Sequence, residues 1–123
     1  LSEEKAMRQL DQVLLEQKKP MGCVVGMFNL PYLPIEYRFH FNGHNICIIG
    51  KDEETGDYCV LDSNATQKVT ISREDLLKVR FAKGGTYPLM GQMYWIKSVP
   101  EHIPDLKPLI FKSIKKTCWY MVY

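Results

Sequence analysis

The feature that most constrains this chain is the stretch GHNICIIGKDEETGDYCVLDSN, residues 43–64. Two short apolar runs, NICIIG and YCVLD, flank a polar segment that carries a glycine and several acidic residues. This pattern is typical of an antiparallel β-hairpin, and it predicts paired strands over residues 45–50 and 58–62. A chain with such a hairpin near its centre is expected to build a sheet around it.

The segment before the hairpin predicts a helix, a strand and a loop. Ser2 is a suitable N-cap for an amphipathic helix that is expected to run to about Lys18, ahead of Pro20. The run MGCVVGMF is typical of a buried strand. The next stretch, NLPYLPIEYRF, contains two prolines and several aromatic residues, so we expect an ordered loop that lies against the body.

The segment after the hairpin predicts two strands and two helices. ATQKVTI is a candidate short strand, and Ser72 with Asp75 resembles a capping box that opens a helix ending at Val79 or Phe81. GQMYWIKSV is strand-like, and PDLKPLIFKSIKKTCWYMVY predicts a last helix. The expected fold class is α+β, with a mainly antiparallel sheet and helices at both ends of the chain.

Length, charge and apolar runs exclude several classes of protein. The 123 residues fit one domain, which we assign to residues 1–123. The 16 basic residues are scattered and nearly balanced by 14 acidic ones, so a nucleic-acid partner is not expected. The apolar runs are far shorter than the ~20 residues that cross a bilayer, so no membrane span is expected.

The four cysteines show no spacing typical of a metal site or a C-x-x-C redox motif. We therefore expect free thiols, a reducing and hence cytoplasmic location, and neither metal nor cofactor. The chain begins without Met and without a secretory pattern, so we expect it to be a fragment of a longer protein.

The expected register of the hairpin predicts which side chains of its two strands lie opposite one another. A turn centred near Glu53 places four pairs of residues opposite one another: His44 and Asp62, Ile46 and Val60, Ile48 and Tyr58, and Cys47 and Cys59. The last pair allows a disulfide, but we favour two buried, small apolar side chains, because facing strand positions often suit disulfide geometry poorly.

His44 and Asp62 are the candidate site. Facing side chains have Cβ atoms about 4.5–5.5 Å apart, so a carboxylate can accept a hydrogen bond from the imidazole. That bond fixes the tautomer and leaves the second ring nitrogen free to take a proton from a nucleophile. The structural alternatives are a strand-edge histidine bonded to backbone for His44 and a turn-forming residue for Asp62. His40 and His102 are assigned structural roles only.

No residue in the chain is a good candidate nucleophile. Cys23 lies inside an apolar strand, where burial raises the pKa of a thiol. Cys118 lies near the end of the last helix, where the helix dipole disfavours a thiolate. Ser63 is more typical of a turn residue.

The segments KKPMGCVVGMFNLPYLP, GHNICIIGKDEETGDYCVLDS and VTISREDLLKVR resemble the butirosin biosynthesis protein H N-terminal domain family, and more distantly the papain-like C39 peptidases. The likeness extends over most of residues 5–120. It implies a papain-like, C39-like half-barrel in which His44 is the catalytic histidine and Asp62 its acidic partner. The family's nucleophilic Cys, at the start of an upstream helix, has no counterpart here, so the resemblance implies that this helix is missing.

The resemblance also implies a reaction and its partners. The intact protein would transfer an acyl group from an acyl-carrier-protein thioester to a small amine through an acyl-cysteine, or hydrolyse an amide by the same chemistry. Tyr32 and Tyr37 are candidates to line the substrate cleft, against the alternative that they only pack the loop. Two other functions stay open: a catalytically inactive binding module with the same fold, and an export-linked peptidase domain. Self-association is expected if an apolar face or a sheet edge is exposed.

Overall fold

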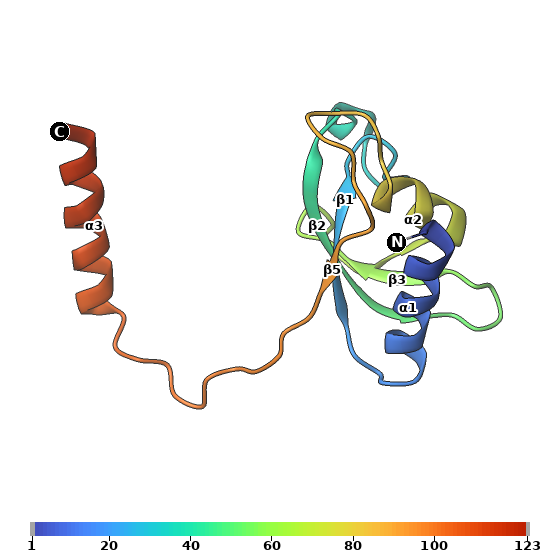
Figure 1. Ribbon diagram of the computed structural model, residues 1–123, viewed down its shortest axis with the longest axis horizontal. Coiled ribbons are helices and arrows are strands. Elements are labelled where there is room, and N and C mark those ends of the chain that lie inside the picture. The colour runs from blue at the N-terminus through green and yellow to red at the C-terminus, as the bar shows by residue number, and fades with distance from the viewer. Residues whose placement is uncertain (1, 123) are drawn as a thin grey trace.

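One antiparallel sheet of five strands forms the centre of the computed structural model, which describes residues 2–122 (Figure 1). The strands lie in the order β4-β3-β2-β1-β5, and every neighbouring pair is antiparallel. The elements in chain order are α1 (Glu3–Leu15), β1 (Met21–Gly26), the 3-10 helix η1 (Ile35–Tyr37), β2 (Asn42–Lys51), β3 (Tyr58–Leu61), β4 (Val69–Ile71), α2 (Arg73–Arg80), β5 (Met93–Tyr94) and α3 (Lys107–Val122). The α+β class and the antiparallel sheet are confirmed.

Several element ends differ from the predicted ones. The first helix ends at Leu15 rather than Lys18, and Lys18 adopts a left-handed backbone conformation with φ of 53°. The stretch expected to be a strand over residues 91–99 contributes only Met93 and Tyr94, because the chain leaves the sheet after two residues. The capping box at Ser72 is confirmed: its Oγ accepts the Asp75 N–H and donates to the Asp75 carboxylate.

The central hairpin forms as predicted, but the predicted register is wrong. Ile48 lies opposite Val60 and Cys47 opposite Leu61, and a bulge then places Gly50 opposite Cys59. The turn spans Asp52 to Asp57, where Gly56 has φ of +77°. It is therefore centred beyond Glu53, and the predicted pairs are displaced by two residues.

A displacement of two residues keeps every side chain on its original face, because side chains alternate with a period of two. Ile46, Ile48 and Val60 accordingly remain on the same side as His44, and all are buried. Cys47 and Cys59 do not face each other, and both are free thiols. The disfavoured disulfide is therefore absent.

Helices α1 and α2 cover one face of the sheet, here called the inner face (Figure 1). Ser2 caps α1 by accepting the Lys5 N–H, and the helix buries one apolar stripe consisting of Ala6, Met7, Leu10 and Leu14. Because burial of a large aliphatic side chain is worth about 1.5–3 kcal/mol, this stripe is a main source of cohesion between helix and sheet. The opposite side of the sheet, here called the outer face, has neither helix against it.

Two buried polar residues fasten loops to this core, and the sequence pattern did not indicate either. Arg80 is fully buried; its guanidinium donates to the carbonyls of Ala6 and Gly91 and contacts the Met7 sulfur. Asn42 donates to the carbonyls of Ala82, Gly84 and Tyr87. Their bonds hold the loop of residues 81–92 against the end of the sheet.

The loop of residues 27–41 lies against the body, as predicted. Leu30 and Leu33 are buried in the core, and Tyr32 packs partly against it. The only regular structure in the loop is the single turn η1, which has no buried residue. This packing places Tyr32 above the inner face.

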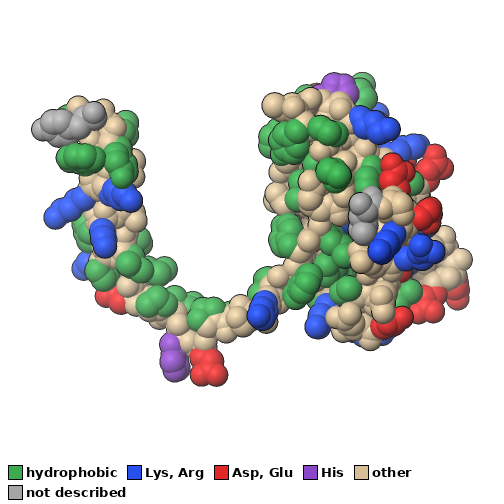
Figure 2. All heavy atoms as spheres, in the orientation of Figure 1, with side chains coloured by type: hydrophobic (Ala, Val, Ile, Leu, Met, Phe, Trp, Pro, Cys, Tyr) green, Lys and Arg blue, Asp and Glu red, His purple; other side chains and the backbone are tan. Residues whose placement is uncertain are grey.

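The C-terminal arm, residues 95–122, extends away from the sheet. Residues 97–106 are exposed and without regular structure, and α3 has no buried residue. Figure 2 shows the arm separated from the body by open space. Among residues 2–122, no helix combines the length and apolar character that crossing a bilayer requires.

Candidate active site

His44 lies on the inner face of the sheet, beside Val25 on β1. It alternates with buried residues along β2, so its ring points toward the side covered by the helices and the loop of residues 27–41. About a tenth of its side chain remains accessible to solvent. The imidazole is therefore held in place by its surroundings but still open on one side.

Asp62 follows directly after β3 and its side chain is fully buried. One oxygen, Oδ2, lies 2.8 Å from Nε2 of His44, and the other, Oδ1, accepts the Asn64 N–H at 2.8 Å. The two residues are therefore in hydrogen-bonding contact although the register places Asp62 beyond the pair of Cys47 and Leu61. The carboxylate of Asp62 therefore does both: Oδ1 accepts the N–H of the turn, and Oδ2 contacts His44.

Tyr32 is the third member of this group. Its hydroxyl donates to Oδ2 of Asp62 at 2.7 Å, the same oxygen that lies against His44. Tyr32 is expected from the sequence to line a substrate cleft or to pack the loop, whereas in the structure its hydroxyl bonds the carboxylate of Asp62. The aromatic loop alone gave no signal for this contact, which depends on how the loop folds back over the sheet.

The bonds to Asp62 also determine its charge. Burial raises the pKa of Asp62, but hydrogen bonds from the Asn64 N–H, His44 and Tyr32 outweigh burial and leave the pKa below its ordinary value. Burial and the bond to the carboxylate both raise the pKa of Tyr32, far beyond its usual range. At neutral pH the group therefore consists of a carboxylate and a neutral phenol.

The geometry assigns different surroundings to the two nitrogens of His44. Nε2 is the nitrogen against Asp62, and a carboxylate in that position favours a proton on Nε2. Nδ1 has no hydrogen-bond partner among the described residues. A neutral imidazole in this tautomer presents Nδ1 as a proton acceptor.

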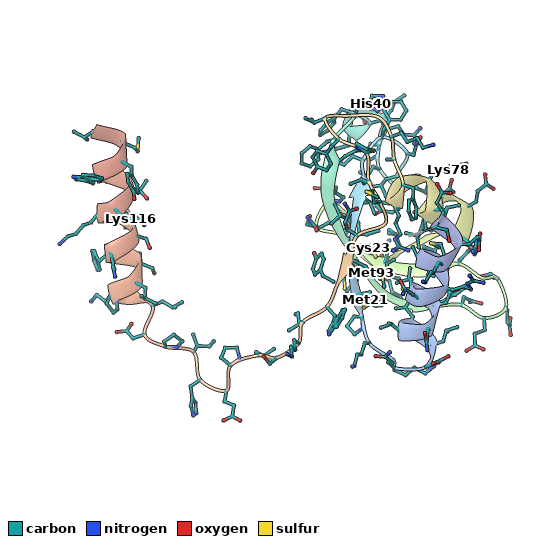
Figure 3. The ribbon with its side chains drawn as sticks, viewed as in Figure 1. Met21, Cys23, His40, Lys78, Met93 and Lys116 are labelled. Atoms are coloured by element: carbon teal, nitrogen blue, oxygen red, sulfur yellow. The ribbon has the colours of Figure 1, made fainter. Side chains whose placement is uncertain are left out.

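None of the four cysteines is hydrogen-bonded to His44 within the described part of the chain. Cys23 is fully buried in β1, and burial raises its pKa to about 11, in line with the structural role expected for it (Figure 3). Cys47 alternates with the buried residues of β2 and lines a groove on the outer face. Cys118 is exposed on α3, and Ser63 lines the same outer groove as Cys47.

The remaining candidate residues lie apart from the pair. Tyr37 belongs to η1, is half-exposed and has no hydrogen bond to either His44 or Asp62. His40 stacks on Phe28 with ring centroids 4.1 Å apart, in the loop at one end of the molecule (Figure 3). His102 is exposed in the arm. Within residues 2–122, no cluster of His, Cys, Asp and Glu has the arrangement of a metal site.

The comparisons with known proteins identify a family for the chain. The model of the family described as Butirosin biosynthesis protein H, N-terminal, matches residues 1–63. This segment ends just after Asp62 and so contains His44, Asp62 and Tyr32. No curated protein and no solved structure matches the chain. Since the matched segment covers half of the sequence, the chain belongs to the butirosin biosynthesis protein H N-terminal family.

Proposed function

We propose that this chain supplies the base and its orienting carboxylate to a cysteine-dependent acyl-transfer site. The observation that carries the proposal is the bond between His44 and a fully buried carboxylate, while the second ring nitrogen has no partner among residues 2–122. A base held by a third group is the arrangement that activates a thiol nucleophile.

In the proposed reaction, Nδ1 of His44 takes the proton of a cysteine thiol, and the thiolate attacks the carbonyl carbon of an acyl thioester. The C–S bond to the carrier breaks, and the carrier thiolate takes the proton from the imidazolium. An amine then attacks the acyl-cysteine while His44 accepts its proton and returns it to the departing cysteine sulfur. Replacing the amine by water, and the thioester by an amide, gives hydrolysis by the same steps.

The carboxylate of Asp62 stabilises the imidazolium in both steps and holds the ring in its orientation. Because its pKa lies below the ordinary value, Asp62 stays ionised while His44 gains and loses its proton. Tyr32 is a positioning residue here: its hydroxyl fixes the oxygen that His44 contacts.

The nucleophile in this proposal is a cysteine outside residues 1–123, since none of the chain's own cysteines contacts His44 in the described structure. Residues 1–123 are then one part of a single papain-like domain. An acyl-carrier protein and a small amine are the proposed substrates, without a metal or cofactor. A reducing compartment such as the cytoplasm suits the proposal because the nucleophile must be a free thiol.

The test uses the full-length natural protein that contains this chain. The protein is mixed with an N-acetylcysteamine thioester, and the acyl adduct is located by mass spectrometry. His44→Ala should slow formation of the adduct about 10²–10⁴-fold, the usual contribution of a general base. His40→Ala is the matched control, because this histidine only stacks on an aromatic ring.

An adduct that forms equally fast in His44→Ala would overturn the role of His44. If even the natural protein forms no adduct with any acyl thioester, the second candidate function holds instead: an inactive binding module with the same fold. The absence of a cysteine beside His44 in the described residues is the observation that favours this alternative.

A further inference from the structure

The register of the sheet does not place His44 and Asp62 directly opposite each other. Cys47 and Leu61 form the last pair on β2 and β3, so the next position sets Asp62 opposite Ile46. His44 is therefore a diagonal neighbour of Asp62, and diagonal neighbours have Cα atoms about 7–8 Å apart. The two side chains meet because Nε2, the ring nitrogen farther from the backbone, points at Oδ2. A carboxylate turned in another direction would miss the ring.

A tight turn directs the carboxylate of Asp62. The Ala65 N–H donates to the Asp62 carbonyl at 3.1 Å, which closes a four-residue turn over residues 62–65. Inside this turn the Asn64 N–H donates to Oδ1 of Asp62 at 2.8 Å. Oδ1 is thereby tied to the main chain two residues further on, so the carboxylate cannot rotate about its Cβ–Cγ bond without breaking this hydrogen bond. The turn therefore determines which oxygen faces His44.

Asn64 makes this contact through its backbone alone. Its side chain is exposed and forms no hydrogen bond with any other of residues 2–122. Among these residues Lys18 is the only one other than glycine with a positive φ, so the backbone of Asn64 suits other residue types as well. What position 64 must supply is therefore an N–H, which every residue except proline has.

The Asn64 N–H also contributes most among the hydrogen bonds that keep Asp62 ionised. Burial raises the pKa of Asp62, and the Asn64 N–H opposes burial more than the hydrogen bonds from His44 or Tyr32 do. As a main-chain donor inside a closed turn, it stays aimed at the carboxylate while His44 gains and loses its proton. A donor held in this way costs no reorganisation during a reaction, which suits a carboxylate that must keep its orientation.

We propose that Asn64 is a positioning residue: its backbone N–H holds Oδ1 of Asp62, so that Oδ2 stays on Nε2 of His44 and Nδ1 stays free to act as the base. The inference rests on the proposed function, because it concerns the same base. It adds that the turn of residues 62–65, rather than the strand pairing, fixes the orientation of the pair. Tyr32 acts on Oδ2 from the loop of residues 27–41, so it cannot replace the bond to Oδ1.

The test removes the N–H at position 64 from an otherwise matched pair of proteins. In the full-length natural protein that contains this chain, lactic acid is incorporated in place of Asn64, which turns the N–H into an ester oxygen. Asn64→Ala is the matched control, because it has the same methyl side chain and keeps the N–H. Three quantities are compared: the pKa of Asp62 by carboxyl ¹³C NMR, the protonation of the two His44 nitrogens by ¹⁵N NMR, and the rate of acyl-adduct formation with an N-acetylcysteamine thioester.

Asn64→Ala should match the natural protein in all three measurements. In the ester protein the pKa of Asp62 should rise toward its ordinary value, and neutral His44 should lose part of its population protonated on Nε2. Adduct formation should slow about 10-fold, as expected for the loss of one hydrogen bond to a charged group. Asn64→Pro also lacks the N–H and should change the pKa of Asp62 in the same direction. Circular dichroism of each variant checks that the fold is retained.

An ester protein whose Asp62 pKa and His44 spectrum both equal those of Asn64→Ala would overturn the proposal. An unchanged rate of adduct formation beside altered spectra would overturn it as well, because the turn would then not position the base. If the spectra change as expected but the natural protein itself forms no adduct, the turn holds the pair as inferred and the proposed function fails instead.

Discussion

The inner and outer faces of the sheet use the same alternating strands for different purposes. The inner face is covered by α1, α2 and the loop of residues 27–41, and both oxygens of the buried Asp62 accept hydrogen bonds there. None of the three helices in residues 2–122 lies against the outer face, which presents an apolar groove. The burial of Asp62 suits the orienting role proposed for it, whereas the groove leaves apolar side chains open to solvent. The candidate site and the apolar groove therefore lie on opposite sides of one thin layer.

The largest expected effect comes from a matched pair of substitutions on β2. Ile48 is fully buried on the inner face, and its neighbour Ile49 is 41% exposed on the other side of the strand. Ile48→Ala should lower the free energy of unfolding by about 2–5 kcal/mol, because it leaves a cavity in the core. Ile49→Ala should cost less than about 1 kcal/mol. Urea titration followed by circular dichroism measures both, and equal losses would contradict the division into two faces.

Removing the charge of Asp62 should have the next largest effect. In Asp62→Asn, the Asn64 N–H, His44 and the Tyr32 hydroxyl face an uncharged and weaker acceptor. We therefore expect the free energy of unfolding to fall by about 2 kcal/mol at neutral pH. The substitution should also change how the free energy of unfolding depends on pH. The pKa of Asp62 is lowered in the folded state, so the stability from its ionised form is present above the ordinary aspartate value of about 3.9 and is lost as pH falls through the lower folded pKa.

This pH dependence separates the role of Asp62 from general acid unfolding. Denaturant unfolding is measured at a series of pH values below about 4. The free energy of unfolding should fall more steeply with decreasing pH for the natural protein than for Asp62→Asn. Parallel curves for the two proteins would mean that the carboxylate has no special bonding in the folded state.

The smallest effect is expected for Tyr32→Phe, which removes one hydroxyl and keeps the ring. Losing a hydrogen bond to the carboxylate should cost about 1 kcal/mol and raise the pKa of Asp62 toward its ordinary value. Carboxyl ¹³C NMR titration measures that pKa directly. Tyr37→Phe is the control, since Tyr37 has no bond to the pair, and an equal change in both variants would contradict the position of Tyr32.

The sequence was sufficient for the elements that local patterns determine. The hairpin could be predicted from its alternating apolar residues and its turn residues, and the start of α2 from the N-cap at Ser72. Each of these patterns lies within a few consecutive residues. The contact between His44 and Asp62 was found for a partly wrong reason. The turn centre was misjudged and the bulge after Ile48 was not foreseen, yet a shift of two residues returns each side chain to its face.

What the sequence could not supply were contacts between segments distant in the chain. The bond from Tyr32 to Asp62 joins residues 30 positions apart, and the bonds of Arg80 to Ala6 and Gly91 join the loop and α1 through a buried cation. The spacing of apolar residues along the sequence does not indicate which distant polar residues will be in contact. The sequence predicted a helix at α3 but not that all of its residues would be exposed, because an amphipathic helix normally buries one face against its own body.

The proposed function requires that His44 holds a proton on Nε2, against Asp62, and offers Nδ1 as the base. The most direct test is the ¹⁵N NMR spectrum of the imidazole, with His44→Gln used to assign its signals. For neutral His44 we expect a protonated Nε2 and an Nδ1 chemical shift typical of an unprotonated, pyridine-like nitrogen. A neutral ring protonated on Nδ1 instead would leave no proton acceptor on the accessible side and would contradict the role proposed for His44.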